Sequence, residues 1–170
     1  MKILSAPAVA AAAVVLSVCT TSTLAQDAVQ WTTAEGGNGH WYAIREAPFL
    51  SWLEAKNIAN EEGGHLATMT SGPETDFIVN NFQDNPLTDF PWIGLYQEDG
   101  SVEPDGGWKW ITGESLDYTN WDSDEPSNGA SGEHEGNVWL YTCTGGGNCR
   151  PKGAWNDWRQ ASKPDANSGP

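Results

Sequence analysis

Six side chains with oxygen donors lie in two short stretches of the second half of the sequence. They are Glu125, Ser127, Asn128, Glu133, Asn156 and Asp157. Calcium takes about six to eight oxygen ligands from carboxylates, amides and carbonyls, and this set supplies suitable groups. Without a cation these carboxylates would repel one another. A solvated acidic loop is the alternative, and composition alone favours it.

Pro126 lies between the first two of these residues and stiffens the turn there. A cis bond between Glu125 and Pro126 would aim the neighbouring side chains and carbonyls at one point. Asn156 and Asp157 belong to a later segment, 153–158, that can return beside the loop. The two stretches therefore converge if this segment packs against the loop.

Two helices and two short strands are expected in the first half of the chain. Alternation over 40–44 predicts a first strand. Ser51 and Glu54 form a capping box for a helix that ends at Gly63-Gly64. A short strand is expected over 65–69.

Ser71 caps a second helix, whose first turn contains Pro73 and Glu74. Strands are then expected over 91–95, 108–111 and 138–141, and 153–158 leads into a last one. The long loop 112–137 lies between strands, which favours a functional role for it. Helices followed by antiparallel strands indicate an α+β domain.

Length and charge limit the class of protein. Residues 1–25 resemble a secretory signal peptide, with an apolar run too short to span a bilayer. About 145 residues remain, which suits one domain: a flexible lead-in over 26–39 and a domain over 40–170. The net charge of −15 disfavours nucleic acid and membrane partners and suits a cation. We expect a secreted or extracellular protein, periplasmic or on the cell surface if it is bacterial.

The aromatic and sulfur-containing residues give two further expectations. Ten tryptophans exceed what packing needs, so we expect most in the core and one or two in contact with ligand. Cys143 and Cys149 flank a Gly-rich segment and are expected to form a disulfide in an exported chain.

Four separate motifs, in order, resemble those of a C-type lectin domain. They are Gly63-Gly64-His65-Leu66-Ala67-Thr68, Trp92-Ile93-Gly94-Leu95, Tyr118-Thr119-Asn120-Trp121 with Glu125-Pro126-Ser127, and Trp155-Asn156-Asp157. The resemblance spans nearly all of residues 40–158. It implies two helices packed on antiparallel sheets, with a long loop that holds calcium.

The resemblance also implies ligands for calcium and sugar. The calcium ligands would be Glu125, Ser127, Glu133, Asn156 and Asp157, and the sugar-binding residues would be Glu125, Ser127, Asn128, Glu133 and Asn156. Two neighbouring sugar hydroxyls would coordinate the same calcium. Glu125-Pro126 implies a preference for mannose, glucose or fucose.

Three features depart from the family pattern. Ser127 stands where an asparagine is usual, so the amide donor to the sugar is missing unless Asn128 replaces it. The usual long-range disulfides are absent. Residues 161–170 lack apolar alternation, so the domain is expected to lack its final strand and to leave the first strand unpaired.

Other sites and functions remain open from the sequence. A second calcium site would use Asp99, Glu103, Asn128 and Glu133, although the segment around Asp99 also suits an exposed hairpin turn. Glu125 and Glu133 could pose as the acid and base of a glycosidase, but this leaves Pro126 and the Asn156-Asp157 pair unexplained. We expect a binding protein rather than an enzyme, with a protein-binding or adhesive module as the alternative to sugar binding.

Overall fold

The computed structural model describes residues 28–45, 50–82, 91–127, 137–141 and 151–158. Its helices and strands are β1 (Val29–Gln30), η1 (Thr33–Glu35), β2 (Trp41–Tyr42), α1 (Trp52–Glu61), α2 (Gly72–Phe82), β3 (Trp92–Gln97), β4 (Trp108–Trp110), β5 (Asn137–Leu140) and β6 (Trp155–Trp158). None of the described helices is long and apolar enough to cross a membrane.

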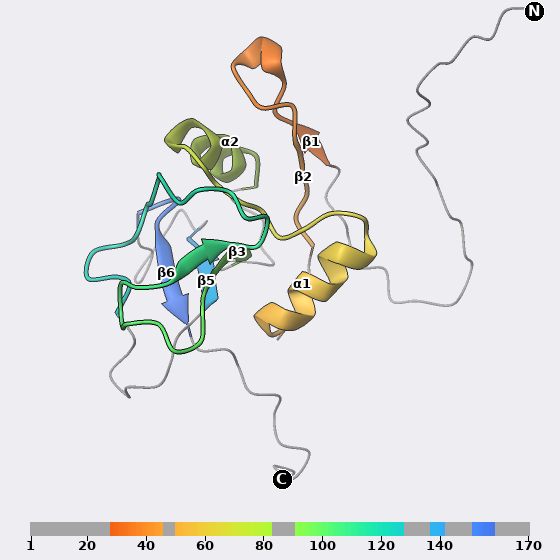
Figure 1. The fold of residues 1–170 in the computed structure, drawn as a ribbon. Coiled ribbons are helices and arrows are strands. Elements are labelled where there is room, and N and C mark those ends of the chain that lie inside the picture. The colour runs from red at the N-terminus through yellow and green to blue at the C-terminus, as the bar shows by residue number, and fades with distance from the viewer. Residues whose placement is uncertain (1–27, 46–49, 83–90, 128–136, 142–150, 159–170) are drawn as a thin grey trace, which may run out of the picture.

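The core of the fold is a four-stranded sheet with the order β4-β3-β5-β6. All three neighbouring pairs run antiparallel. The two helices lie apart from each other beside this sheet, as Figure 1 shows. The predicted α+β class, with two helices and antiparallel sheets, is confirmed.

Helix α1 begins as its sequence predicts. The Ser51 side chain accepts a hydrogen bond from the Glu54 backbone, and the Glu54 side chain accepts one from the Ser51 backbone. Trp52 fixes the helix to the sheet, because its indole donates to the Ile93 carbonyl at 2.7 Å and its ring packs on Tyr96. The capping box was predictable because it depends on residues three positions apart.

Helix α2 supplies apolar side chains to the core. Ser71 accepts from the Glu74 backbone at 3.3 Å, as expected of the residue that caps this helix. Ile78, Val79 and Phe82 then join one buried cluster with side chains of the sheet such as Leu95. The spacing of one, three and four residues keeps these three on one face of the helix.

Residues 28–39, which fall within the expected lead-in over 26–39, carry part of the fold. Val29 pairs with Tyr42 and Gln30 with Trp41, so β1 and β2 form a hairpin. Trp31 is buried and stacks on Phe77 of α2. The first strand therefore has a partner, which corrects the expectation that it would be unpaired; residues 159–170 lie outside the described residues.

A buried carboxylate joins this hairpin to α2. Glu74 accepts hydrogen bonds from Asn38 at 2.7 Å, from Tyr42 at 2.5 Å, and from the backbone and hydroxyl of Thr70 at 2.7 and 3.0 Å. Burial, together with the hydrogen bond to Glu74, raises the pKa of Tyr42 well above its usual range. Four donors compensate the carboxylate for its loss of water.

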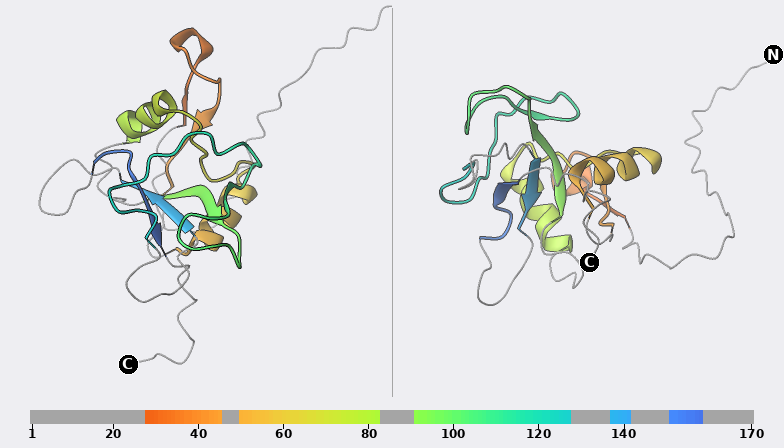
Figure 2. Two further views of the ribbon diagram at one scale, coloured as in Figure 1. Left: turned by 60° about the vertical axis from the view of Figure 1, so that its left-hand side comes forward. Right: turned by 90° about the horizontal axis from the view of Figure 1, so that it is seen from below.

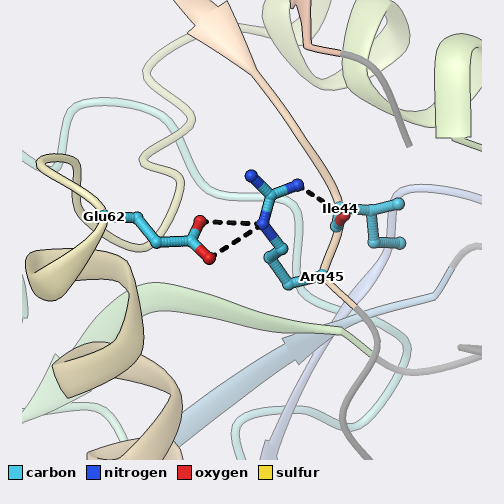
Figure 3. A network of polar contacts seen from close by, with 3 residues as sticks. All are labelled: Ile44, Arg45 and Glu62. Atoms are coloured by element: carbon cyan, nitrogen blue, oxygen red, sulfur yellow. Dashed lines mark hydrogen bonds and ion pairs between the residues drawn. The ribbon is translucent and has the colours of Figure 1, made fainter. Parts of the chain in front are cut away.

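An ion pair also links the hairpin to α1. Figure 3 shows the guanidinium of Arg45, just after β2, facing the carboxylate of Glu62 at the end of α1. The Nε atom of Arg45 lies 2.7 and 3.0 Å from the two carboxylate oxygens. Both side chains are partly exposed, so the pair contributes no more than about 1 kcal/mol.

The strand predicted over 65–69 is wrong. Both edges of β3 already pair, with β4 on one side and β5 on the other. The segment instead meets β3 at Gly94, whose backbone donates to the Ala67 carbonyl at 2.8 Å, and its Met69 side chain is fully buried in the core. A side chain at Gly94 would clash there, since a Cβ would lie 2.8 Å from the Leu66 carbonyl.

The remaining strands agree with the sequence to within a few residues. Strands β3, β4 and β5 match the expected segments 91–95, 108–111 and 138–141. The segment 153–158 was expected to lead into a last strand, and its second half is itself β6. Within the predicted loop, residues 112–127 contain no helix or strand and run beside β6 in both views of Figure 2.

Candidate calcium and sugar site

Asn156 and Glu125 meet between β6 and the loop. The Asn156 amide nitrogen donates to Oε1 of Glu125 at 2.6 Å. Strand β6 fixes Asn156 by pairing it with Trp139 of β5. The amide of Asn156 and the carboxylate of Glu125, which come from segments far apart in the sequence, therefore lie next to each other.

Asp157 and Ser127 make the second contact between the same segments. Both carboxylate oxygens of Asp157 accept from the Ser127 backbone N–H, at 3.1 and 3.2 Å. Asp157 is only 2% exposed. A buried carboxylate is costly unless charged or polar groups compensate it, so its position indicates a specific role for it.

The turn that carries Glu125 is built from the residues just before it. The Glu125 backbone donates to the Asp122 carbonyl at 3.1 Å. Asp124 has a positive φ of 69°, and the Glu125–Pro126 bond is cis. The turn directs the Glu125 side chain toward Asn156 and the next backbone N–H toward Asp157.

Asn120 holds the start of this loop against the chain that enters β6. Its side-chain amide donates to the Gly153 carbonyl at 2.7 Å, and its own carbonyl accepts from the Trp155 backbone at 2.8 Å. The Asp122 backbone then donates to the Trp155 carbonyl at 2.9 Å. These contacts fix the loop relative to the strand just before the site residues of each segment.

Aromatic rings fill the space behind the site. Trp155 is fully buried and meets Trp110, Tyr118 and Trp121 in edge-to-face contacts. Trp121 also packs edge-on against Trp108. Most tryptophans are thus buried or half-buried as expected, and the two exposed ones are Trp41 and Trp158.

Comparisons with known proteins identify the family. The Lectin C-type domain family matches residues 49–162, which is most of the chain. The chain belongs to the C-type lectin domain family. The predicted resemblance is confirmed, and so is the expectation of a binding protein rather than an enzyme.

Individual relatives place this C-type lectin domain in a wide family. It is 34% identical to regenerating islet-derived protein 3-alpha of Mus musculus over 108 residues, 58% of this chain and 57% of that protein. The carbohydrate-recognition domain of the mouse scavenger receptor C-type lectin has a TM-score of 0.50 and 26% identity, covering 66% of this chain and 75% of that one.

A calcium-independent type II antifreeze protein shares the fold. Its TM-score is 0.51 at 23% identity, and the match covers 68% of this chain and 74% of that one. The fold of a C-type lectin domain therefore does not by itself imply that calcium is bound. The chain spans about half the length of the first curated relatives it matches.

Part of the expected calcium set converges in the described residues. Glu125, Ser127, Asn156 and Asp157 meet, while Asn128 and Glu133 lie outside the described residues. The described ranges contain no group of three or more His, Cys, Asp or Glu side chains suited to a metal. Two carboxylates, an amide and a hydroxyl still form an all-oxygen set, which fits part of a calcium shell.

Other predicted site residues have different surroundings. Asp99 and Glu103 lie in the connection between β3 and β4, where the Glu103 carboxylate accepts from the Gln97 amide at 3.0 Å. Their expected companions in a second calcium site, and the pair Cys143 and Cys149, lie outside the described residues.

Asn120 and Asp122 are positioning residues that the sequence analysis did not assign. Asn120 donates from its side-chain amide to the Gly153 carbonyl and Asp122 from its backbone to the Trp155 carbonyl, contacts that residue type alone does not predict. Asp122 is buried, and its side chain accepts from the Ser123 backbone at 2.8 Å. The one sequence signal for the role of Asp122 was its position directly after Trp121 of the motif, because a carboxylate beside a core residue is seldom buried without a specific contact.

Proposed function

We propose that this C-type lectin domain binds carbohydrate in a calcium-dependent manner at the junction of the loop and β6. The calcium ligands are Glu125, Ser127, Glu133, Asn156 and Asp157, and the sugar-binding residues are Glu125, Ser127, Asn128, Glu133 and Asn156. The contact between Asn156 and Glu125 is the observation that carries the proposal.

The pairing of an amide with a carboxylate suits recognition of a sugar hydroxyl. A hydroxyl can donate to the Glu125 carboxylate while it accepts from the Asn156 amide. Bound calcium would supply a positive charge that attracts hydroxyl oxygens and neutralises the carboxylates of Glu125, Glu133 and Asp157. Asp157, held by the Ser127 backbone, keeps the loop and the strand together around that position.

Ser127 affects the strength and selectivity of this site. Its backbone N–H is engaged by Asp157, so the donor that its side chain offers to a ligand is the short hydroxyl. A hydroxyl has a shorter reach than an amide and lacks two N–H donors. We propose that the site binds sugars of the mannose, glucose or fucose class, more weakly than a site with asparagine at this position would bind them. We also propose that residues 1–25 act as a secretory signal that directs export of the chain.

A protein-binding or adhesive module is the second candidate. Ser127 favours this candidate, because serine in place of the usual asparagine removes an amide donor to sugar while leaving the fold intact. The calcium-independent antifreeze protein of the same fold shows that this architecture does not require a cation. This candidate predicts no specific sugar binding in the presence of calcium.

A glycan panel distinguishes the two candidates. The full chain is tested in calcium and in EDTA, together with Asp157→Ala and the matched control Asp117→Ala, an exposed carboxylate of the same loop. Our proposal predicts sugar binding that EDTA and Asp157→Ala abolish and Asp117→Ala preserves. Calcium-stabilised folding with no sugar bound on the panel would overturn it in favour of protein binding.

A further inference from the structure

Trp158 lies on the same face of the sheet as Asn156. The two residues are two positions apart on β6, so their side chains point to one side and are separated by about 7 Å along the strand. Strand pairing supports this, because Trp139 of β5 stands opposite Asn156 and Asn137 stands opposite Trp158. The tryptophan therefore adjoins the amide of the proposed sugar site.

Two further tryptophan rings support Trp158 from one side. Trp158 stacks on Trp139 with 4.6 Å between ring centroids and 24° between planes. Trp139 in turn packs on Trp92 at 5.6 Å, and the Trp92 indole donates to the Leu50 carbonyl at 2.8 Å. This ladder restricts the rotamers of Trp158 and lowers the entropy that it would lose on contact with a ligand.

The ring nevertheless remains accessible. Trp158 is 41% exposed, whereas Trp155 on the opposite face of the same strand is fully buried. A braced aromatic ring with an exposed portion has the properties of a binding hot spot, because it offers a large apolar area at little entropic cost. Its position beside polar groups that suit hydroxyls indicates which ligand it would contact.

We infer that Trp158 forms a second subsite, on which the sugar ring next to the coordinated one stacks, so that the ligand is an oligosaccharide. A sugar ring combines hydroxyls at its edge with C–H groups on its face. The polar groups of Glu125 and Asn156 suit the hydroxyls, and the indole of Trp158 suits the C–H face. This inference rests on the proposed function, which it extends from a single sugar to a chain of at least two.

Titration with short and long ligands tests the second subsite. The probes are the methyl glycosides of mannose, glucose and fucose, and trisaccharides of mannose and of glucose, all with saturating calcium. The variants are Trp158→Ala and Trp158→Phe. The matched control is Trp41→Ala, which removes another exposed tryptophan, 65% accessible, from the distant strand β2.

The inference predicts that the native chain binds a trisaccharide more tightly than the corresponding methyl glycoside. Trp158→Ala should weaken the trisaccharide about tenfold and leave the methyl glycoside unchanged. Trp158→Phe should retain part of the difference, and Trp41→Ala all of it. Calcium affinity and thermal unfolding, measured on each variant, show that the site and the fold persist.

Two results would overturn the second subsite while leaving the proposed function intact. One is equal affinity of the native chain for trisaccharides and methyl glycosides. The other is a loss in Trp158→Ala that is the same for both ligands, since this would place the indole against the coordinated sugar itself. Failure of the native chain to bind any of these sugars, with calcium bound, would overturn both proposals.

Discussion

The side chains of Asn156 and Glu125 are joined by a 2.6 Å hydrogen bond although 31 positions separate them in the chain. A second contact, from the Ser127 backbone to Asp157, spans 30 positions. Both contacts link the loop to β6, so the relative placement of these two segments determines the site.

Asn120 should affect calcium binding without contacting calcium. Its amide holds the Gly153 carbonyl, three residues before Asn156, so Asn120→Ala should let the start of β6 shift relative to the loop. We expect calcium affinity to fall by about tenfold, as when an outer partner of a metal ligand is removed. Calcium titration checks this, with Asn80→Ala on the exposed side of α2 as control. Lower thermal stability with unchanged calcium affinity would limit Asn120 to a structural role.

Gly153 should tolerate no side chain, for two physical reasons. Its φ is +78°, and an added Cβ would lie 2.8 Å from Cγ2 of Thr75. Gly153→Ala should therefore lower the free energy of unfolding by about 1–3 kcal/mol. Urea denaturation measures the loss. Gly113→Ala is the control, because Gly113 has a φ of +80° with no atom near an added Cβ. Equal losses in the two variants would show that contact with Thr75 adds nothing.

Tyr42 should make the fold sensitive to alkaline pH. Because burial raises its pKa above the usual value, the folded state holds the phenol proton more tightly than the unfolded state does. Its contribution to stability is complete below about pH 10, the ordinary tyrosine pKa, and is lost as the pH rises beyond it. Urea denaturation at pH 8 and 11 should show a smaller pH-dependent loss for Tyr42→Phe than for the native chain. An identical loss in both would contradict this account.

Local sequence patterns predicted the parts of the fold that depend on nearby residues. The capping box of Ser51 and Glu54 lies within one helical turn, so its chemistry is complete in four residues. The strand expected over 65–69 was wrong because pairing depends on whether a partner edge is available, and β3 has both edges occupied. The two-residue strand β1 was missed because so short a segment has no periodicity.

The site shows the same division between local and long-range information. Residue types indicated oxygen donors at Glu125, Asn156 and Asp157, but their convergence needed the family resemblance, since no local pattern relates a loop to a strand about 30 residues later. The role of Trp158 depends on the register of β5 and β6, which places its ring against Trp139. A hydrophobic pattern can predict that a residue is buried, but it does not predict how β5 and β6 are aligned.

Calcium titration by isothermal calorimetry tests the central claim most directly. The native chain is compared with Glu125→Gln and Asp157→Asn, which keep side-chain size, and with Asp117→Asn in the same loop. We predict that the native chain and Asp117→Asn bind calcium alike, whereas the other two variants bind it at least about tenfold more weakly, because a carboxylate ligand is lost. Native-like calcium binding by Glu125→Gln and Asp157→Asn would contradict the account.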